Sequence, residues 1–201
     1  MLDGAARKII GPGLDRLGVV LARHGVSADL VTIIGFAIGV AAAGAIAARL
    51  YALGLVLILA SRLCDGLDGA VARARDATDR GGFLDIVLDF AFYGLVPLGF
   101  VLAEPQANAV AGATLLFSFY VNGASFLAYA VMAEKRGLAS EVYREKSLHF
   151  TSGLAEATET IFVFLLFCLF PGSFAPIAYV FAAVTLVTAV SRAFLAARVF
   201  R

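Results

Sequence analysis

The segment Cys64–Asp89, CDGLDGAVARARDATDRGGFLDIVLD, connects two long apolar runs and contains six aspartates. Four of these aspartates lie within the apolar runs or at their edges: Asp65, Asp68, Asp85 and Asp89. A carboxylate at the centre of a bilayer costs about 2.5–3.5 kcal/mol, so four unpaired carboxylates there would cost roughly 10–14 kcal/mol. If the runs enter a membrane, we therefore expect a partner that stabilises these charges.

The composition around this segment is that of a membrane protein. Of 201 residues, 61% are hydrophobic, and the mean hydropathy is +0.92. A soluble domain of this size is nearer half apolar, and the apolar runs here approach or exceed the twenty residues that cross a bilayer. The sequence therefore predicts an all-α integral membrane protein. The net charge of +1, without a dominant basic patch, argues against a nucleic-acid partner.

Residues 1–26 form a separate juxtamembrane segment. Their apolar residues recur at spacings of three and four, with basic residues between them. This pattern predicts an amphipathic helix on the membrane surface, broken by the Gly-Pro-Gly at 11–13, although it also fits an ordinary packed helix. The N-terminus has mixed charge and lacks a short apolar core followed by a cleavage site, so we expect no cleavable signal peptide.

Residues 27–201 are predicted to form a six-helix membrane domain. Ser27 is the expected N-cap of the first span. The second span is apolar only to about Cys64, and its helix is expected to continue out of the membrane through the aspartates. The predicted spans are 28–48, 51–75, 83–103, 109–133, 153–171 and 175–197.

Basic residues set the predicted orientation, because Lys and Arg accumulate on the cytoplasmic side of a membrane. The expected cytoplasmic segments contain thirteen basic residues, whereas the opposite loops contain only Arg49. Both termini and the aspartate-rich connection are therefore predicted to face the cytosol. The thirteen are Arg7, Lys8, Arg16, Arg23, Arg73, Arg75, Arg80, Lys135, Arg136, Arg144, Lys146, Arg198 and Arg201.

The spacing of the four aspartates predicts a metal site. Asp65 and Asp68 are three residues apart and Asp85 and Asp89 are four apart, so each pair shares one helix face. A short connection would let the two faces meet as an antiparallel hairpin. Four convergent carboxylates suit one or two hard divalent cations, most naturally Mg²⁺. The alternative is that the aspartates form ion pairs with Arg62, Arg73, Arg75 and Arg80.

Glycine and arginine residues beside the first aspartate pair point to a phosphate ligand. Gly66 and Gly69 remove side chains there, which allows a bulky ligand to approach the backbone. Arg73, one turn further on, would place a guanidinium against phosphate. Together with a metal, these residues predict a diphosphate site at a membrane edge.

The motif Asp65-x2-Asp68-Gly69-x2-Ala72-Arg73-x7-Gly81-x3-Asp85-x3-Asp89 resembles the signature of the CDP-alcohol phosphotransferases, also called CDP-alcohol phosphatidyltransferases. The resemblance extends over essentially the whole chain and is strongest to small bacterial inner-membrane members. It implies a transferase of phospholipid biosynthesis that passes a phosphatidyl group from CDP-diacylglycerol to an alcohol and releases CMP. It also implies Mg²⁺ or Mn²⁺, with two ions bound, and a homodimer in the bacterial inner membrane.

The resemblance also assigns roles to individual residues. Asp65, Asp68 and Asp85 would be metal ligands, with Asp89 beside the metals as the base for the acceptor hydroxyl. The segment SADLVT at 27–32 is similar to a nucleotide-binding segment of the family, although Ala28 and Asp29 replace its usual proline and asparagine. The residues implied to contact CDP are Asp29, Thr32, Asp65, Gly69, Ala72 and Arg73.

The alcohol acceptor is left open by the sequence. Arg144, Lys146 and His149 would bind an acceptor phosphate, as in glycerol 3-phosphate or inositol phosphate. Glu156 and Glu159, three residues apart on one helix face, would instead attract a cationic amino alcohol such as serine, ethanolamine or choline. We favour the phosphorylated polyol, because a cytosolic cluster of cations neutralises a dianion without burying unpaired charge.

Two other classes of membrane protein also place acidic residues in the bilayer. Intramembrane prenyltransferases use aspartates and Mg²⁺ to bind diphosphates, but they have more spans and do not explain Gly69-x2-Ala72-Arg73. A cation transporter needs a polar path across the bilayer. The predicted outer loops and outer halves of the spans contain almost no charged residues to provide one.

Overall fold

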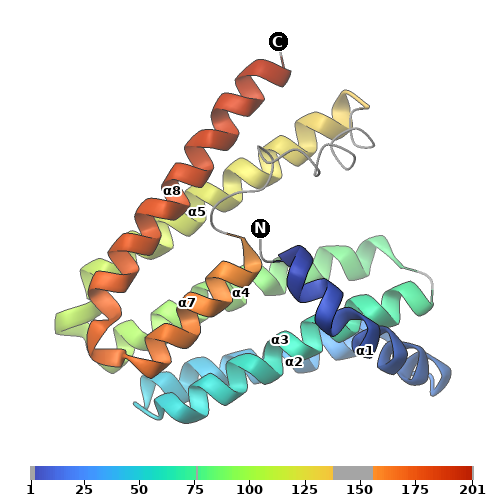
Figure 1. The fold of residues 1–201 in the computed structure, drawn as a ribbon, viewed down its shortest axis with the longest axis horizontal. Coiled ribbons are helices and arrows are strands. Elements are labelled where there is room, and N and C mark those ends of the chain that lie inside the picture. The colour runs from blue at the N-terminus through green and yellow to red at the C-terminus, as the bar shows by residue number, and fades with distance from the viewer. Residues whose placement is uncertain (1–2, 76, 138–155, 201) are drawn as a thin grey trace.

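The computed structural model describes residues 3–75, 77–137 and 156–200, and over these ranges the chain is helical without any strand. Figure 1 shows the arrangement of the helices. Their bounds are α1 (Asp3–Arg23), α2 (Ala28–Ala47), α3 (Tyr51–Ala74), α4 (Asp79–Ala103), α5 (Pro105–Lys135), α7 (Ala157–Leu169), the 3₁₀ turn η1 (Pro171–Ser173) and α8 (Phe174–Val199).

Local capping residues set several helix ends. Ser27 caps α2, as predicted, and its Oγ accepts a hydrogen bond from the Leu30 amide at 3.3 Å. Thr78 caps α4 in the same way, through the Gly81 amide at 3.0 Å. Proline is favoured in the first turn of a helix because it needs no hydrogen-bond partner there, and Pro105 begins α5.

Among the described residues, four helices are long and apolar enough to cross a membrane: α2, α4, α5 and the 29-residue stretch Pro171–Val199 that ends with α8. The two other predicted spans are also helical, but they differ in character. Helix α3 carries Arg62, Asp65, Asp68 and Arg73 in its second half. Helix α7 has 13 residues, a length of about 20 Å against the roughly 30 Å of a bilayer core.

Glycines allow α2 to pack closely between its neighbours α3 and α4. A Cβ atom on Gly35 would lie 2.8 Å from Cys64 Cβ, and one on Gly39 would lie 2.6 Å from the Phe92 ring. Small residues at helix interfaces permit this approach in membrane proteins, where van der Waals contact drives helix association.

A cluster of buried aromatic rings joins α4, α7 and α8. Phe100 stacks on Phe174 at a centroid distance of 5.0 Å, and Phe167 lies 4.7 Å from Phe174 and 5.5 Å from Phe100. At the other end of the cluster, Phe164 lies 6.2 Å from Phe92. All five rings are at most 1% exposed, so they fix α4 against the second half of the chain.

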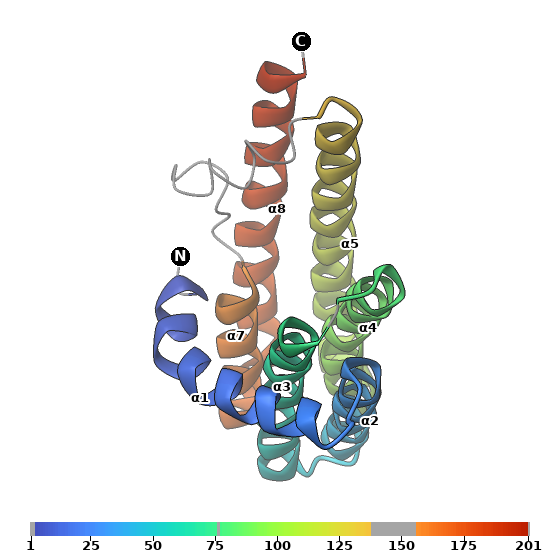
Figure 2. The same cartoon turned by 90° about the vertical axis from the view of Figure 1, so that its right-hand side faces the viewer.

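Helix α1 is continuous through the Gly-Pro-Gly at 11–13, so the predicted break there is wrong. Proline removes its own amide hydrogen bond and clashes with the carbonyl one turn before it, which kinks a helix without necessarily ending it. Figure 2 shows that α1 changes direction along its length and crosses α3. A Cβ on Gly18 would lie 2.7 Å from Ala70, and one on Gly66 would lie 2.8 Å from Leu14, which places α1 against the aspartate end of α3.

Helices α5 and α8 lie side by side and extend beyond the other helices (Figures 1 and 2). Arg192 Nη1 of α8 donates to Ser125 Oγ at 2.7 Å and to Asn122 Oδ1 at 2.9 Å on α5. At the far end of the pair, Arg136 Nη2 donates to the Phe200 carbonyl at 2.7 Å. These bonds fix α5 and α8 to one another along the second half of both helices.

Candidate active site

The four aspartates converge, as their spacing predicted, on one small pocket. Asp65 and Asp68 project from α3, and Asp85 and Asp89 from α4. The two helices do not enclose the pocket alone, because α2 packs against both and adds Thr32, Gly35 and Phe36 to the lining. The two helices therefore do not meet as the predicted simple hairpin, because α2 packs between them, which the aspartate spacing did not indicate.

Three of the four carboxylates form a cluster suited to a cation. One oxygen from each of Asp65, Asp68 and Asp85 lies within 4.8 Å of the others. Asp68 is 5% exposed, and within the described residues its Oδ2 atom is buried without a hydrogen-bond partner. Three carboxylates at this separation repel one another unless a cation lies between them. The all-oxygen donor set therefore fits Mg²⁺ or Mn²⁺, with these three aspartates as the residues that would hold the metal.

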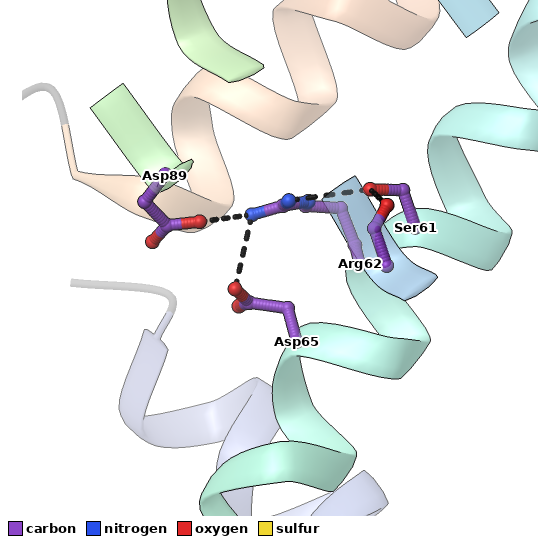
Figure 3. Close-up of polar contacts among 5 residues, drawn as sticks. Ser61, Arg62, Asp65 and Asp89 are labelled. Atoms are coloured by element: carbon purple, nitrogen blue, oxygen red, sulfur yellow. Dashed lines mark hydrogen bonds and ion pairs between the residues drawn. The ribbon is translucent and has the colours of Figure 1, made fainter. Parts of the chain in front are cut away.

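Asp89 has a different partner. Arg62 Nη1 lies 2.7 Å from Asp89 Oδ1 and 3.3 Å from Asp65 Oδ1, and Figure 3 shows the guanidinium between the two carboxylates. The alternative of aspartate–arginine pairing thus applies to part of the set. Asp68 and Asp85 form no ion pair with any described residue.

Arg62 was not predicted as a site residue. The available signal was its position three residues before Asp65, which places both on one face of α3. Its partner on α4 is 27 residues away, and such a long-range contact depends on how the helices pack.

A larger cavity of about 480 Å³ opens beside the acidic pocket and shares Asp68, Asp85 and Thr32 with it. Of the residues implied to contact CDP, Asp29, Thr32, Gly69 and Ala72 line this cavity. Asp65 lines only the acidic pocket of the two. The remaining lining residues are Ser27, Ala28, Val71, Arg75, Ala77, Thr78, Gly81 and Gly82.

Arg73, predicted to face a phosphate, does not line the cavity, whereas Arg75 does. Arg73 turns toward α1, where its Nη2 lies 2.8 Å from Asp15 Oδ1, and it does not line the cavity. Arg75 does line it, and its Nη1 donates to the Gly25 and Val26 carbonyls at 3.4 and 3.3 Å. Sequence spacing did not single out Arg75, because its contacts depend on the connection between α1 and α2.

Of the predicted acceptor residues, the structure describes only the two glutamates, and they lie apart from this geometry. Arg144, Lys146 and His149 fall outside the described residues. Glu156 is the N-cap residue of α7 and Glu159 lies in its first turn. Both are half-buried, and neither lines the acidic pocket or the cavity beside it.

Comparisons with known proteins agree with the motif. The chain is 49% identical over 192 residues to the inner membrane protein YnjF of Escherichia coli K12, which covers 96% of this chain and 93% of that protein. It is 32% identical over 160 residues to the archaetidylinositol phosphate synthase of Methanothermobacter thermautotrophicus, covering 79% and 71% of the two chains.

The fold is similar to that of a solved structure, the Mycobacterium tuberculosis phosphatidylinositol phosphate synthase PgsA1 with CDP-DAG bound. The TM-score is 0.71 at 23% identity, and the match covers 90% of this chain and 92% of that one. A model of the CDP-alcohol phosphatidyltransferase family matches residues 26–191, which contain the aspartate motif and its supporting helices. The chain therefore belongs to the CDP-alcohol phosphatidyltransferases and is a transferase.

Proposed function

We propose that the protein transfers a phosphatidyl group from a CDP-linked lipid, such as CDP-diacylglycerol, to an alcohol during phospholipid biosynthesis. The observation that carries this proposal is the three-carboxylate cluster opening on a 480 Å³ cavity that shares Asp68 and Asp85 with it. The size suits a nucleotide and the acidic edge suits its metal-bound diphosphate. The family assignment supports neither a prenyltransferase nor a transporter.

The cavity is the proposed CDP site. Asp29, Thr32, Gly69 and Ala72 would contact the nucleotide, with Asp65 at the diphosphate end. The absence of a side chain at Gly81 lets the Asp29 carboxylate approach closely, because a Cβ there would lie 3.1 Å from Asp29 Oδ1. Arg73, now paired with Asp15, would have to leave that exposed pair to reach the nucleotide.

Two divalent cations, Mg²⁺ or Mn²⁺, held by Asp65, Asp68 and Asp85 with Asp89 beside them, would neutralise the diphosphate and the leaving phosphate. Asp89 accepts the proton of the acceptor hydroxyl. The hydroxyl oxygen forms a bond to the lipid-side phosphorus, the bond from that phosphorus to the bridging oxygen breaks, and CMP leaves with the electron pair. Leu88 lines the same pocket.

We propose a phosphorylated polyol as the acceptor, either inositol phosphate or glycerol 3-phosphate. The relatives named as archaetidylinositol phosphate synthases support an inositol phosphate. Arg144, Lys146 and His149 are the proposed ligands of its phosphate. The alternative acceptor, an amino alcohol, would depend on Glu156 and Glu159.

We propose six membrane spans, α2 to α5, α7 and α8, in the bacterial inner membrane. Residues 1–26 then form the interfacial segment and residues 27–201 the catalytic domain, with both termini and the site facing the cytosol. Two contacts support a common basic end: Arg75 bonds to the α1–α2 connection, and Arg136 bonds to the end of α8. The family resemblance supports a homodimer.

The test is CMP release by purified protein supplied with radiolabelled CDP-diacylglycerol and Mg²⁺. The acceptors are offered separately: inositol phosphate, glycerol 3-phosphate, inositol, serine, ethanolamine and choline. Turnover with a phosphorylated polyol and none by the Asp68→Asn variant is the expected result. A product formed only from choline or ethanolamine would overturn the acceptor, and absence of CMP with every acceptor would overturn the reaction.

A further inference from the structure

Arg62 is a nearly buried cation inside the acidic pocket. Its side chain is 10% exposed, and its two carboxylate partners come from different helices, Asp65 on α3 and Asp89 on α4. Burying a charge is costly unless partners with good geometry compensate for it. The shorter contact, 2.7 Å, is the one to Asp89.

Two further contacts hold the guanidinium in place, and one of them is itself anchored to α2. It lies over the Phe92 ring at 3.8 Å from the centroid, and its Nη2 donates to Ser61 Oγ at 3.2 Å. Ser61 is fully buried and its hydroxyl donates to the Gly35 carbonyl of α2 at 2.8 Å. Helices α2, α3 and α4 therefore all help to fix the Arg62 side chain. Neutralising its charge would need only the two carboxylates.

Arg62 joins the fourth aspartate to the three-aspartate cluster, because it contacts both Asp65 and Asp89. Asp65, Asp68 and Asp85 form the cluster within 4.8 Å, and Asp89 is bound to Arg62. Arg62 lines the acidic pocket and not the larger cavity, so it contacts the carboxylates and not the proposed nucleotide site.

We propose that Arg62 is a positioning residue, which fixes the Asp89 carboxylate for proton transfer beside the three-aspartate cluster. The inference rests on the proposed function, because Asp89 is the proposed proton acceptor there. Misplacement of such a group by about 1 Å costs on the order of 100-fold in rate. Arg62 thereby acts on turnover through Asp89 and not by binding the donor.

The contact is tested without any substrate. Thermal unfolding of the detergent-purified full chain is measured for wild type, Arg62→Gln, Asp89→Asn and the double variant. Because the two residues share one interaction, the Tm losses are expected to be strongly non-additive. The Asp15–Arg73 pair is the matched control, because its N–O distance of 2.8 Å is similar but both side chains are exposed. Its double-variant cycle should show Tm losses that are nearly additive. Additive losses for Arg62 and Asp89 would overturn the inference.

The positioning role is tested by steady-state CMP release from CDP-diacylglycerol with inositol phosphate or glycerol 3-phosphate. Arg62→Gln is expected to lower kcat about 100-fold and to change the donor KM less than about twofold. Arg62→Lys, which keeps the charge but not the two-pronged geometry, should recover about tenfold of the loss. In the Asp89→Asn background, Arg62→Gln should cause no further fall. Arg49→Gln, at the opposite end of the helices, controls for loss of an arginine contact.

The outcomes separate the two proposals. Lack of CMP release by wild type with every acceptor overturns the proposed function, while the Tm cycle still judges the Arg62–Asp89 contact. A raised donor KM with unchanged kcat would make Arg62 a donor ligand and overturn the positioning role. A further loss of kcat in the Asp89→Asn background would do the same, because Arg62 would then act independently of Asp89.

Discussion

Asp15 of α1 and Arg73 of α3 form an ion pair of 2.8 Å between segments 58 residues apart in the sequence. It attaches the N-terminal helix to the turn of α3 that follows Asp68 and Gly69. Both side chains are more than half exposed, so the pair contributes only about 0.2–1 kcal/mol to stability. The weak pair leaves Arg73 free to exchange Asp15 for a ligand phosphate.

This exchange predicts different behaviour for the two partners. Arg73→Gln should raise the KM for CDP-diacylglycerol about tenfold, the loss of one charged contact. Asp15→Asn should leave that KM within about twofold of wild type, because it removes only the competing carboxylate. Steady-state kinetics on both variants decides the point. Equal effects of the two substitutions would mean that Arg73 acts only by holding α1.

The three-aspartate cluster predicts a strict metal requirement. Asp68→Asn and Asp85→Asn should each lower turnover at least about 100-fold, and EDTA should silence the wild type until Mg²⁺ or Mn²⁺ is restored. Binding of Mn²⁺ measured by electron paramagnetic resonance should weaken in both variants without substrate. Membrane insertion is the control and should be unchanged. Full activity in chelator would contradict the metal site.

Packing beneath the site predicts an asymmetry between two glycines of α2. A Cβ at Gly39 would lie 2.6 Å from the Phe92 ring, which is fully buried and lies beneath the Arg62 guanidinium. Gly39→Ala should therefore destabilise the fold by about 1–3 kcal/mol. Gly44 has no such neighbour within 4 Å, so Gly44→Ala on the same helix should be neutral or stabilising. Thermal unfolding in detergent measures both. Similar Tm values for the two variants would show that Phe92 is free to move.

The topology prediction concerns the two ends of the α5–α8 pair. In a background with Cys64 and Cys168 replaced by alanine, Lys135→Cys and Ser173→Cys should react with a membrane-impermeant maleimide from opposite sides. The physical reason is the excess of basic residues on one side. Labelling of both from one side would mean that a span has been miscounted.

Much of the helical framework was predictable, because apolar runs of bilayer length are a strong signal. The predicted span 28–48 and α2 agree within one residue, as do 51–75 and α3. The start of α4 was predicted four residues late, at 83 and not 79. The apolar run begins only after the polar first turn of α4, whereas the Thr78 cap sets the start of the helix itself.

The candidate site was predictable where it depends on spacing within one helix. The convergence of Asp65 and Asp68 with Asp85 follows from helical periodicity and a short connection. The insertion of α2 between the two helices could not be predicted in this way. It depends on close contacts at Gly35 and Gly39, which residue spacing does not reveal. For the same reason Arg62 was recognised only as a charge partner.

Every described residue that lines the acidic pocket or the cavity belongs to α2, α3, α4 or a turn beside them. Helices α5, α7 and α8 contribute none of these side chains. Buried aromatic rings join α7 and α8 to α4, and α5 packs on α4 directly. The two halves of the chain can therefore diverge at different rates. On the proposed assignment of the acceptor residues, substitution of polar residues in the second half would change which alcohol is used and leave the donor site intact, as long as the aromatic contacts with α4 persist.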